Sequence, residues 1–170
     1  MLVRRELAAD VAAVRAVVAA AFPVPDGAVE PVEAGLLDAL RDDPGWLPAF
    51  SLVAVDRGGE VVGHGVATRG DVDGHSVLGL GPIAVRPDRQ GHGVGTALVH
   101  ALLAAAEACD EVLVALLGEP GFYGRFGFRP ADELGVASPD PTWGGYFQVR
   151  AFTDDAPRGT FRYAAPFAEL

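Results

Sequence analysis

Lysine and asparagine are absent from this sequence of 170 residues, so each of its 13 basic side chains is an arginine. A Schiff-base enzyme, a Walker-type phosphate loop and a protein-kinase site each depend on a lysine amine. All three classes are therefore excluded. A phosphate group would have to be bound by helix termini, backbone amides and arginine instead.

Cysteine and positive charge are also scarce. The single cysteine, Cys109, cannot form an intramolecular disulfide, and the four histidines show no clustered ligand spacing, so no metal is expected. With 23 acidic and 13 basic side chains, the formal net charge is −10. This charge repels a phosphate backbone or an anionic lipid surface, so we expect no nucleic-acid partner.

Long apolar runs and a charged-then-apolar leader are lacking as well. Without a run that spans a bilayer, the sequence predicts no membrane association. Together with the lone cysteine, the missing leader leads us to expect a cytoplasmic protein.

The remaining composition is typical of one folded domain. Half of the residues (50%) are hydrophobic and 21% are charged, and a chain of 170 residues has the length of one ordinary domain. We therefore expect a single domain over residues 1–170. Its apolar periodicity predicts strands at 2–5, 51–56, 60–68, 75–85, 112–117 and, last, 146–152, and helices at 10–22, 31–41, 97–108 and 121–126.

Two local features of this pattern have consequences for function. The strand over 75–85 contains Gly79, Gly81 and Pro82, and because proline cannot donate to a strand ladder we expect a bulge or distortion there. Soon after it, three alternate glycines, Gly91, Gly93 and Gly95, open a helix. Backbone amides and the helix dipole at such a turn attract an anion, and Arg89 adds a charge beside it.

The glycine-rich turn resembles the acyl-CoA signature of the GCN5-related N-acetyltransferase (GNAT) family, Arg/Gln-x-x-Gly-x-Gly/Ala. Gln90, Gly93 and Gly95 satisfy it between a distorted strand and a long helix. A second stretch, Phe122-Tyr-Gly-Arg-Phe-Gly-Phe128, looks like the family's later Tyr-x-x-x-Gly-Phe segment. One helix and one strand separate the two motifs, as in that family.

The resemblance implies a fold and a cosubstrate. The fold is a mixed, mostly antiparallel α/β sheet of six to seven strands with helices on both faces, splayed between its fourth and fifth strands. Acetyl-CoA is the expected cosubstrate, with its pantetheine arm in the splay and its pyrophosphate on the turn. The residues expected to bind it are Ile83, Ala84, Val85, Arg89, Gln90, Gly91, His92, Gly93, Val94, Gly95 and Thr96.

The resemblance also implies acetyl transfer to an amine, with Tyr123 as the general acid on the departing thiolate. The general base stays open among His64, His75, Glu119 and water. The acceptor is either a small-molecule amine or a peptide amine, and residues 22–30 and 138–146, including Trp143, are expected to line its site. A homodimer is also left open.

Two alternatives belong to other functional classes. In a dinucleotide-binding fingerprint the glycines follow their strand at once and the third glycine comes later, so that reading is disfavoured. The other alternative is a catalytically silent acyl-CoA-binding or regulatory module of the same fold. The chain also departs from many relatives, because Leu116-Leu-Gly-Glu-Pro120 stands where they place an asparagine.

Overall fold

The computed structural model describes residues 1–169 and begins with a strand and two helices. Strand β1 covers Leu2–Arg5, helix α1 Val11–Ala21 and helix α2 Val32–Asp42. The buried side chains of α1 recur at helical spacing, as the apolar periodicity predicts, and those of α2 do the same. A proline-containing segment, 23–31, separates the two helices because proline cannot continue a helix.

Asp10, the residue before α1, does not cap this helix with its side chain. The Asp10 carboxylate instead accepts from the Leu7 backbone N–H at 2.8 Å and from Arg4 at 2.6 and 3.0 Å. The hydrogen bonds of Asp10 therefore connect β1 to the short turn before α1, and its side chain makes no capping hydrogen bond to the helix.

Three consecutive strands form an antiparallel meander: β2 (Ser51–Val55), β3 (Val61–Val72) and β4 (His75–Val85). Residues 57–59 form the hairpin turn that joins β2 to β3. In the β3–β4 pair, Gly65 lies opposite Ile83 and Ala67 opposite Leu80, so β4 carries one extra residue at Gly81 and Pro82. The predicted distortion of β4 is therefore confirmed.

The second half of the chain alternates helices and strands. These elements are α3 (Val94–Ala108), β5 (Leu113–Leu117), α4 (Pro120–Tyr123), β6 (Arg129–Pro130), β7 (Val136–Ala137), β8 (Phe147–Ala151) and β9 (Gly159–Arg162). Short 3₁₀ helices lie at Ala8–Asp10, Pro48–Phe50, Pro87–Arg89, Gly124–Phe126, Ala131–Leu134, Pro141–Tyr146 and Ala165–Glu169.

The prediction that the last strand lies at 146–152 was wrong, because β9 follows β8. Strand β9 pairs with the end of β3, where Val72 lies opposite Phe161, so β3 also runs farther than predicted. The apolar side chain of Phe161 is fully buried at this contact.

The strands follow the order β1-β2-β3-β4-β5-β8-β6. All neighbours in this order are antiparallel except β4 and β5, which run parallel. Their pairing covers only Leu78 with Val114 and Gly79 with Ala115, after which the two strands diverge. The expected splay between the fourth and fifth strands is thus present, and it leaves one edge of β4 unpaired from Leu80 to Val85.

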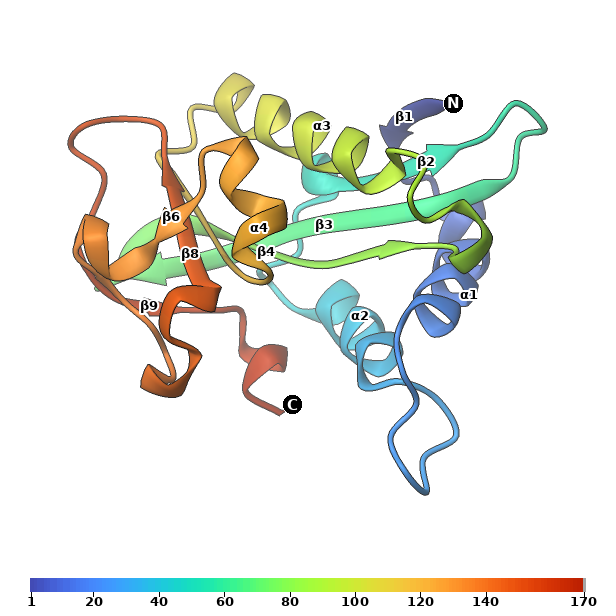
Figure 1. The fold of residues 1–170 in the computed structure, drawn as a ribbon, viewed down its shortest axis with the longest axis horizontal. Helices are drawn as coiled ribbons and strands as arrows, with labels where there is room; N and C mark the ends of the chain where they lie inside the picture. The colour runs from blue at the N-terminus through green and yellow to red at the C-terminus, as the bar shows by residue number, and fades with distance from the viewer. Residues whose placement is uncertain (170) are drawn as a thin grey trace.

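Helices cover both faces of the sheet, α3 on one side and α1 with α2 on the other (Figure 1). Leu98 and Leu102 of α3 pack on one face, and Val14 and Val18 of α1 pack on the other. The open part of the β4–β5 pair lies between these layers, where α3 and α4 begin.

Candidate active site

The glycine-rich turn leads from β4 into α3. Gly91 and Gly93 adopt φ values of +73° and +81°, in the left-handed region that favours glycine. A Cβ built on either residue would meet nothing within 4 Å, so the space in front of the turn is open. The first N–H groups of α3 have no partner within the helix and carry the positive end of its dipole. This turn therefore fits a phosphate group.

A cleft of about 680 Å³ extends from this turn to Ile83 and Val85 in the part of β4 that has diverged from β5. All residues predicted to bind acetyl-CoA line it except Ala84 and His92, and Tyr123 lines it too. Ala84 is buried on the α1 side of the sheet, so only its backbone can face the cleft. Side-chain direction alternates along a strand, which explains why Ile83 and Val85 reach the cleft and Ala84 does not.

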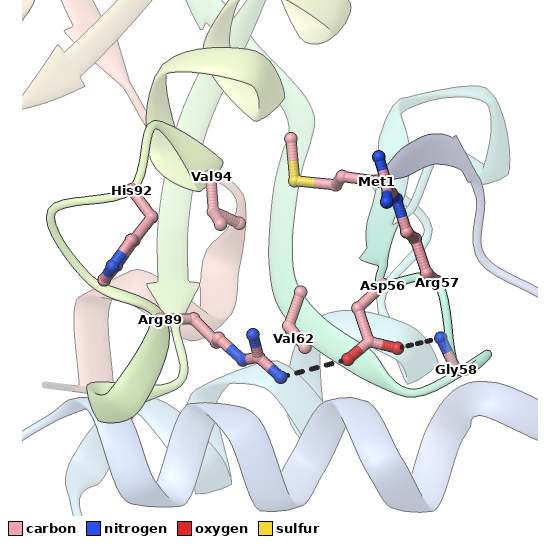
Figure 2. A pocket seen from close by; sticks show the side chains of 8 residues that line it. All are labelled: Met1, Asp56, Arg57, Gly58, Val62, Arg89, His92 and Val94. Atoms are coloured by element: carbon pink, nitrogen blue, oxygen red, sulfur yellow. Dashed lines mark hydrogen bonds and ion pairs between the residues drawn. The ribbon is translucent and has the colours of Figure 1, made fainter.

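His92 instead lines a neighbouring cavity of about 390 Å³ together with Asp56 and Arg89 (Figure 2). Arg89 donates to Asp56 across this cavity at 3.2 Å, and Asp56 also accepts from the Gly58 N–H at 2.9 Å. Arg89 also lies 3.4 Å from a carboxylate oxygen of Asp88. Its charge is therefore partly neutralised within the protein, which weakens it as an anion ligand.

Arg125 is the cation of the cleft that the sequence did not single out. Its guanidinium lies 4.5 Å from the ring centroid of Phe122 and donates to Thr96 Oγ1 at 3.4 Å. No carboxylate of residues 1–169 pairs with it, so its full positive charge faces the cleft beside the turn. Its place inside the second motif was the one signal in the sequence that could have identified it.

Tyr123 is held against the backbone where β5 ends. A Cβ built on Gly118 would overlap Cε2 of Tyr123, so the ring packs directly on this glycine. Phe122 and Phe128 fix the ring from two sides, with ring centroids at 4.9 and 5.9 Å. Burial raises the pKa of Tyr123, so the phenol stays protonated at neutral pH.

A second cavity of about 550 Å³ meets the cleft at Phe22, Ile83 and Tyr123. Three residues from the segments predicted to border the acceptor line this cavity: Phe22, Pro139 and Trp143. Glu33 of α2 and Tyr163 after β9 line this cavity as well, and no motif in the sequence pointed to either residue. Only packing of distant segments brings these two side chains to one place.

None of the three candidate bases lines either cavity. His75 is exposed at the start of β4, where its Nδ1 lies 3.2 Å from the Val72 carbonyl oxygen. Glu119 is exposed at the start of α4 and accepts from the Gly121 N–H at 3.3 Å. His64 is fully buried on the α1 side of β3.

His64 belongs to a buried polar network. Glu6 accepts from Arg41 at 2.5 Å and from the Ser51 hydroxyl, and Ser51 Oγ lies 2.9 Å from His64 Nε2. Burial lowers the pKa of His64. Burial alone would raise the pKa of Glu6, but hydrogen bonds from His64, Ser51 and Arg41 outweigh it and lower that pKa to about 2. This network joins separate elements of the fold, and none of its members lines the cleft.

Among residues 1–169, no group of three or more His, Cys, Asp and Glu side chains is placed to hold a metal ion. In the described part of the chain, none of the helices has the length and apolar character needed to cross a membrane.

Residues 48–130 match the family model described as "Acetyltransferase (GNAT) domain". This range contains the meander, the glycine-rich turn and the segment with Tyr123. Over 161 residues the chain is 32% identical to the uncharacterized N-acetyltransferase YhbS of Escherichia coli, an alignment that covers 94% of this chain and 92% of that protein.

Two solved structures are similar over nearly the whole chain. The structure of YhbS from Escherichia coli in complex with CoA matches with a TM-score of 0.87 and 28% identity, covering 98% of this chain and 91% of that chain. An acetyltransferase from Brucella melitensis in complex with acetyl-CoA matches with a TM-score of 0.79 and 34% identity, covering 98% and 97%.

Proposed function

The chain belongs to the GNAT family of acetyltransferases, and from this premise we propose that it moves an acetyl group from acetyl-CoA to an amine, with Tyr123 as general acid. One observation carries the proposal. The glycine-rich turn, the unpaired edge of β4 and Tyr123 line a single cleft, and a second cavity meets that cleft at Tyr123.

The donor is bound in two parts. The amides of the turn and the charge of Arg125 bind the pyrophosphate of acetyl-CoA. The pantetheine arm lies along β4 from Leu80 to Val85, where no strand of residues 1–169 pairs with the edge facing β5. The Val85 carbonyl on this strand already accepts from the Gln90 side chain at 3.1 Å, which holds the turn against the end of β4.

The reaction needs a neutral amine, support for the oxyanion and a proton for sulfur. The amine nitrogen forms the new bond to the thioester carbon, a backbone N–H of β4 near Ile83 donates to the oxyanion, and the carbon–sulfur bond breaks. The nitrogen loses one proton to water, and Tyr123 gives one proton to the thiolate and regains it from water. The raised pKa makes Tyr123 a weaker acid than a free phenol, but it also keeps the phenol protonated until the thiolate forms and accepts the proton.

Water is the proton acceptor in this proposal because His64, His75 and Glu119 do not line the cavities. His64 is fully buried, and it lines neither the cleft nor the second cavity. Replacing any of the three therefore leaves the base step in place.

Thiol release from acetyl-CoA in the presence of varied amines tests the proposal. The wild type should release free coenzyme A with at least one amine, and Tyr123→Phe should lower kcat by about 100-fold or more with the affinity for acetyl-CoA kept. Tyr146→Phe is the matched control, since Tyr146 is 55% exposed and lines neither cavity.

Unchanged kcat in Tyr123→Phe would remove this phenol from the mechanism. Binding of acetyl-CoA by the wild type with no thiol release for any amine would favour the silent acyl-CoA-binding module instead.

A further inference from the structure

The second cavity carries information about the acceptor. Its volume of about 550 Å³ suits a small molecule, and it opens onto the cleft at Phe22, Ile83 and Tyr123. An amine held there would face the position at which the proposed reaction takes place. The chemistry of the remaining walls therefore selects the acceptor.

Most of these walls are apolar, and one side is aromatic. Tyr163 lies at the centre of this side, with its ring centroid 4.6 Å from that of Phe167 and 6.5 Å from that of Trp143. The Tyr163 ring packs on β4, because a Cβ built on Gly79 would lie 2.6 Å from its Cδ1. Leu36 and Leu80 add aliphatic surface. Such walls bind an apolar body and reject a chain of polar groups.

Two charged side chains line the cavity, Arg162 and Glu33, and only the charge of Arg162 is neutralised by a partner. Arg162 donates to Asp71 at 3.1 and 3.3 Å, so its charge is compensated. Glu33, which is half-buried on α2, forms no ion pair or hydrogen bond with another side chain of residues 1–169. Burial raises the pKa of Tyr163, so that phenol stays neutral. Among the side chains of residues 1–169 that line the cavity, Glu33 thus presents the one uncompensated charge.

We infer that the acceptor is a primary amine with one ammonium group on an apolar body about the size of an aromatic ring, bound by Glu33 and the rings of Trp143, Tyr163 and Phe167. This inference rests on the proposed acetyl transfer. The ammonium pairs with the Glu33 carboxylate, aromatic faces attract the same charge, and the apolar body is removed from water. A polyamine or an amino sugar would bury donors that find no partners on these walls.

The bound ammonium must lose one proton to water before its nitrogen attacks, and the nitrogen then loses a second proton to water as in the proposed reaction. The role of Glu33 is to bind the cation and place its nitrogen, so its loss should act on KM more than on kcat.

The test separates donor binding from acceptor choice. Acetyl-CoA affinity is measured first, by titration calorimetry, for the wild type, Glu33→Gln and Asp42→Asn. Asp42→Asn is the matched control, because it removes the same charge from an exposed end of the same helix. Thiol release is then measured with 2-phenylethylamine, hexylamine, spermidine and glucosamine.

We expect kcat/KM for 2-phenylethylamine to exceed that for spermidine or glucosamine by at least about 10-fold. Glu33→Gln should raise the KM for 2-phenylethylamine by about 10-fold and leave the affinity for acetyl-CoA unchanged. Asp42→Asn should behave as the wild type in both measurements.

Several results would overturn the inference. A preference for spermidine or glucosamine contradicts it, and so does an unchanged KM in Glu33→Gln. Faster transfer from octanoyl-CoA than from acetyl-CoA, with no preference among the amines, would assign the cavity to the acyl chain. A wild type that does not bind acetyl-CoA would instead remove the proposed function on which the inference rests.

Discussion

At the scale of single residues, the cleft owes its charge to Arg125. The chain carries a net charge of −10, so a site for a pyrophosphate needs a cation that no carboxylate neutralises. Arg89, which the sequence favoured, pairs with Asp56, whereas Arg125 is held by Phe122 and Thr96 and keeps its charge free.

Arg125→Gln should therefore weaken acetyl-CoA binding by about 10-fold, the usual loss for one charge-assisted hydrogen bond, and leave kcat at saturating donor unchanged. The measurement is a calorimetric titration. Arg129→Gln is the control, because Arg129 is exposed, pairs with Glu133 at 2.7 Å and does not line the cleft. Equal affinities for the wild type and Arg125→Gln would contradict a role in donor binding.

At the scale of elements, the parts that could be predicted are those with a strong local cause. Pro82, next to Gly81, distorts β4 because proline cannot donate a hydrogen bond to a regular strand ladder. The turn before Val94 requires positive φ at Gly91 and Gly93, which glycine adopts without strain. Strand β9 was missed because it has four residues, follows Pro157, and is stabilised by the distant end of β3.

The same distinction explains which parts of the site could be predicted. Most residues that line the cleft belong to two motifs that are continuous in sequence, so the sequence could name them, although it also named Ala84 and His92 and did not single out Arg125. The second cavity, which we propose holds the acceptor, combines Glu33 of α2, Trp143 and Tyr163, which lie far apart in the chain. Only the packing of α2 and the C-terminal segment against the sheet brings them together, and no local pattern encodes that packing.

At the scale of the whole molecule, the buried network of Glu6, Arg41, Ser51 and His64 joins β1, α2, β2 and β3 and makes stability depend on pH. The pKa of His64 is lowered by burial and that of Glu6 is lowered to about 2 by its hydrogen bonds. Because each of these pKa values is lower in the folded chain, the unfolded chain binds the proton more readily. The contribution of each group to the free energy of unfolding is therefore complete above its unfolded-state pKa and is lost as the pH falls. For His64 this loss begins near pH 6.5, and for Glu6 near pH 4.3.

We therefore expect the free energy of unfolding to fall by about 1–2 kcal/mol between pH 7 and pH 5, owing to His64. Chemical denaturation at several pH values measures it. His64→Gln should remove most of this slope, while His75→Gln, which changes an exposed histidine outside the network, should keep it. A wild type equally stable at pH 7 and pH 5 would contradict the assignment.

The central claim is that the turn before α3 and the splay between β4 and β5 together bind acetyl-CoA. Titration calorimetry of the wild type with acetyl-CoA tests this claim most directly. We predict saturable binding of one molecule per chain with a Kd of roughly 1–100 µM. No detectable binding at a donor concentration of about 1 mM would contradict the account, since a built site should be largely filled at that concentration.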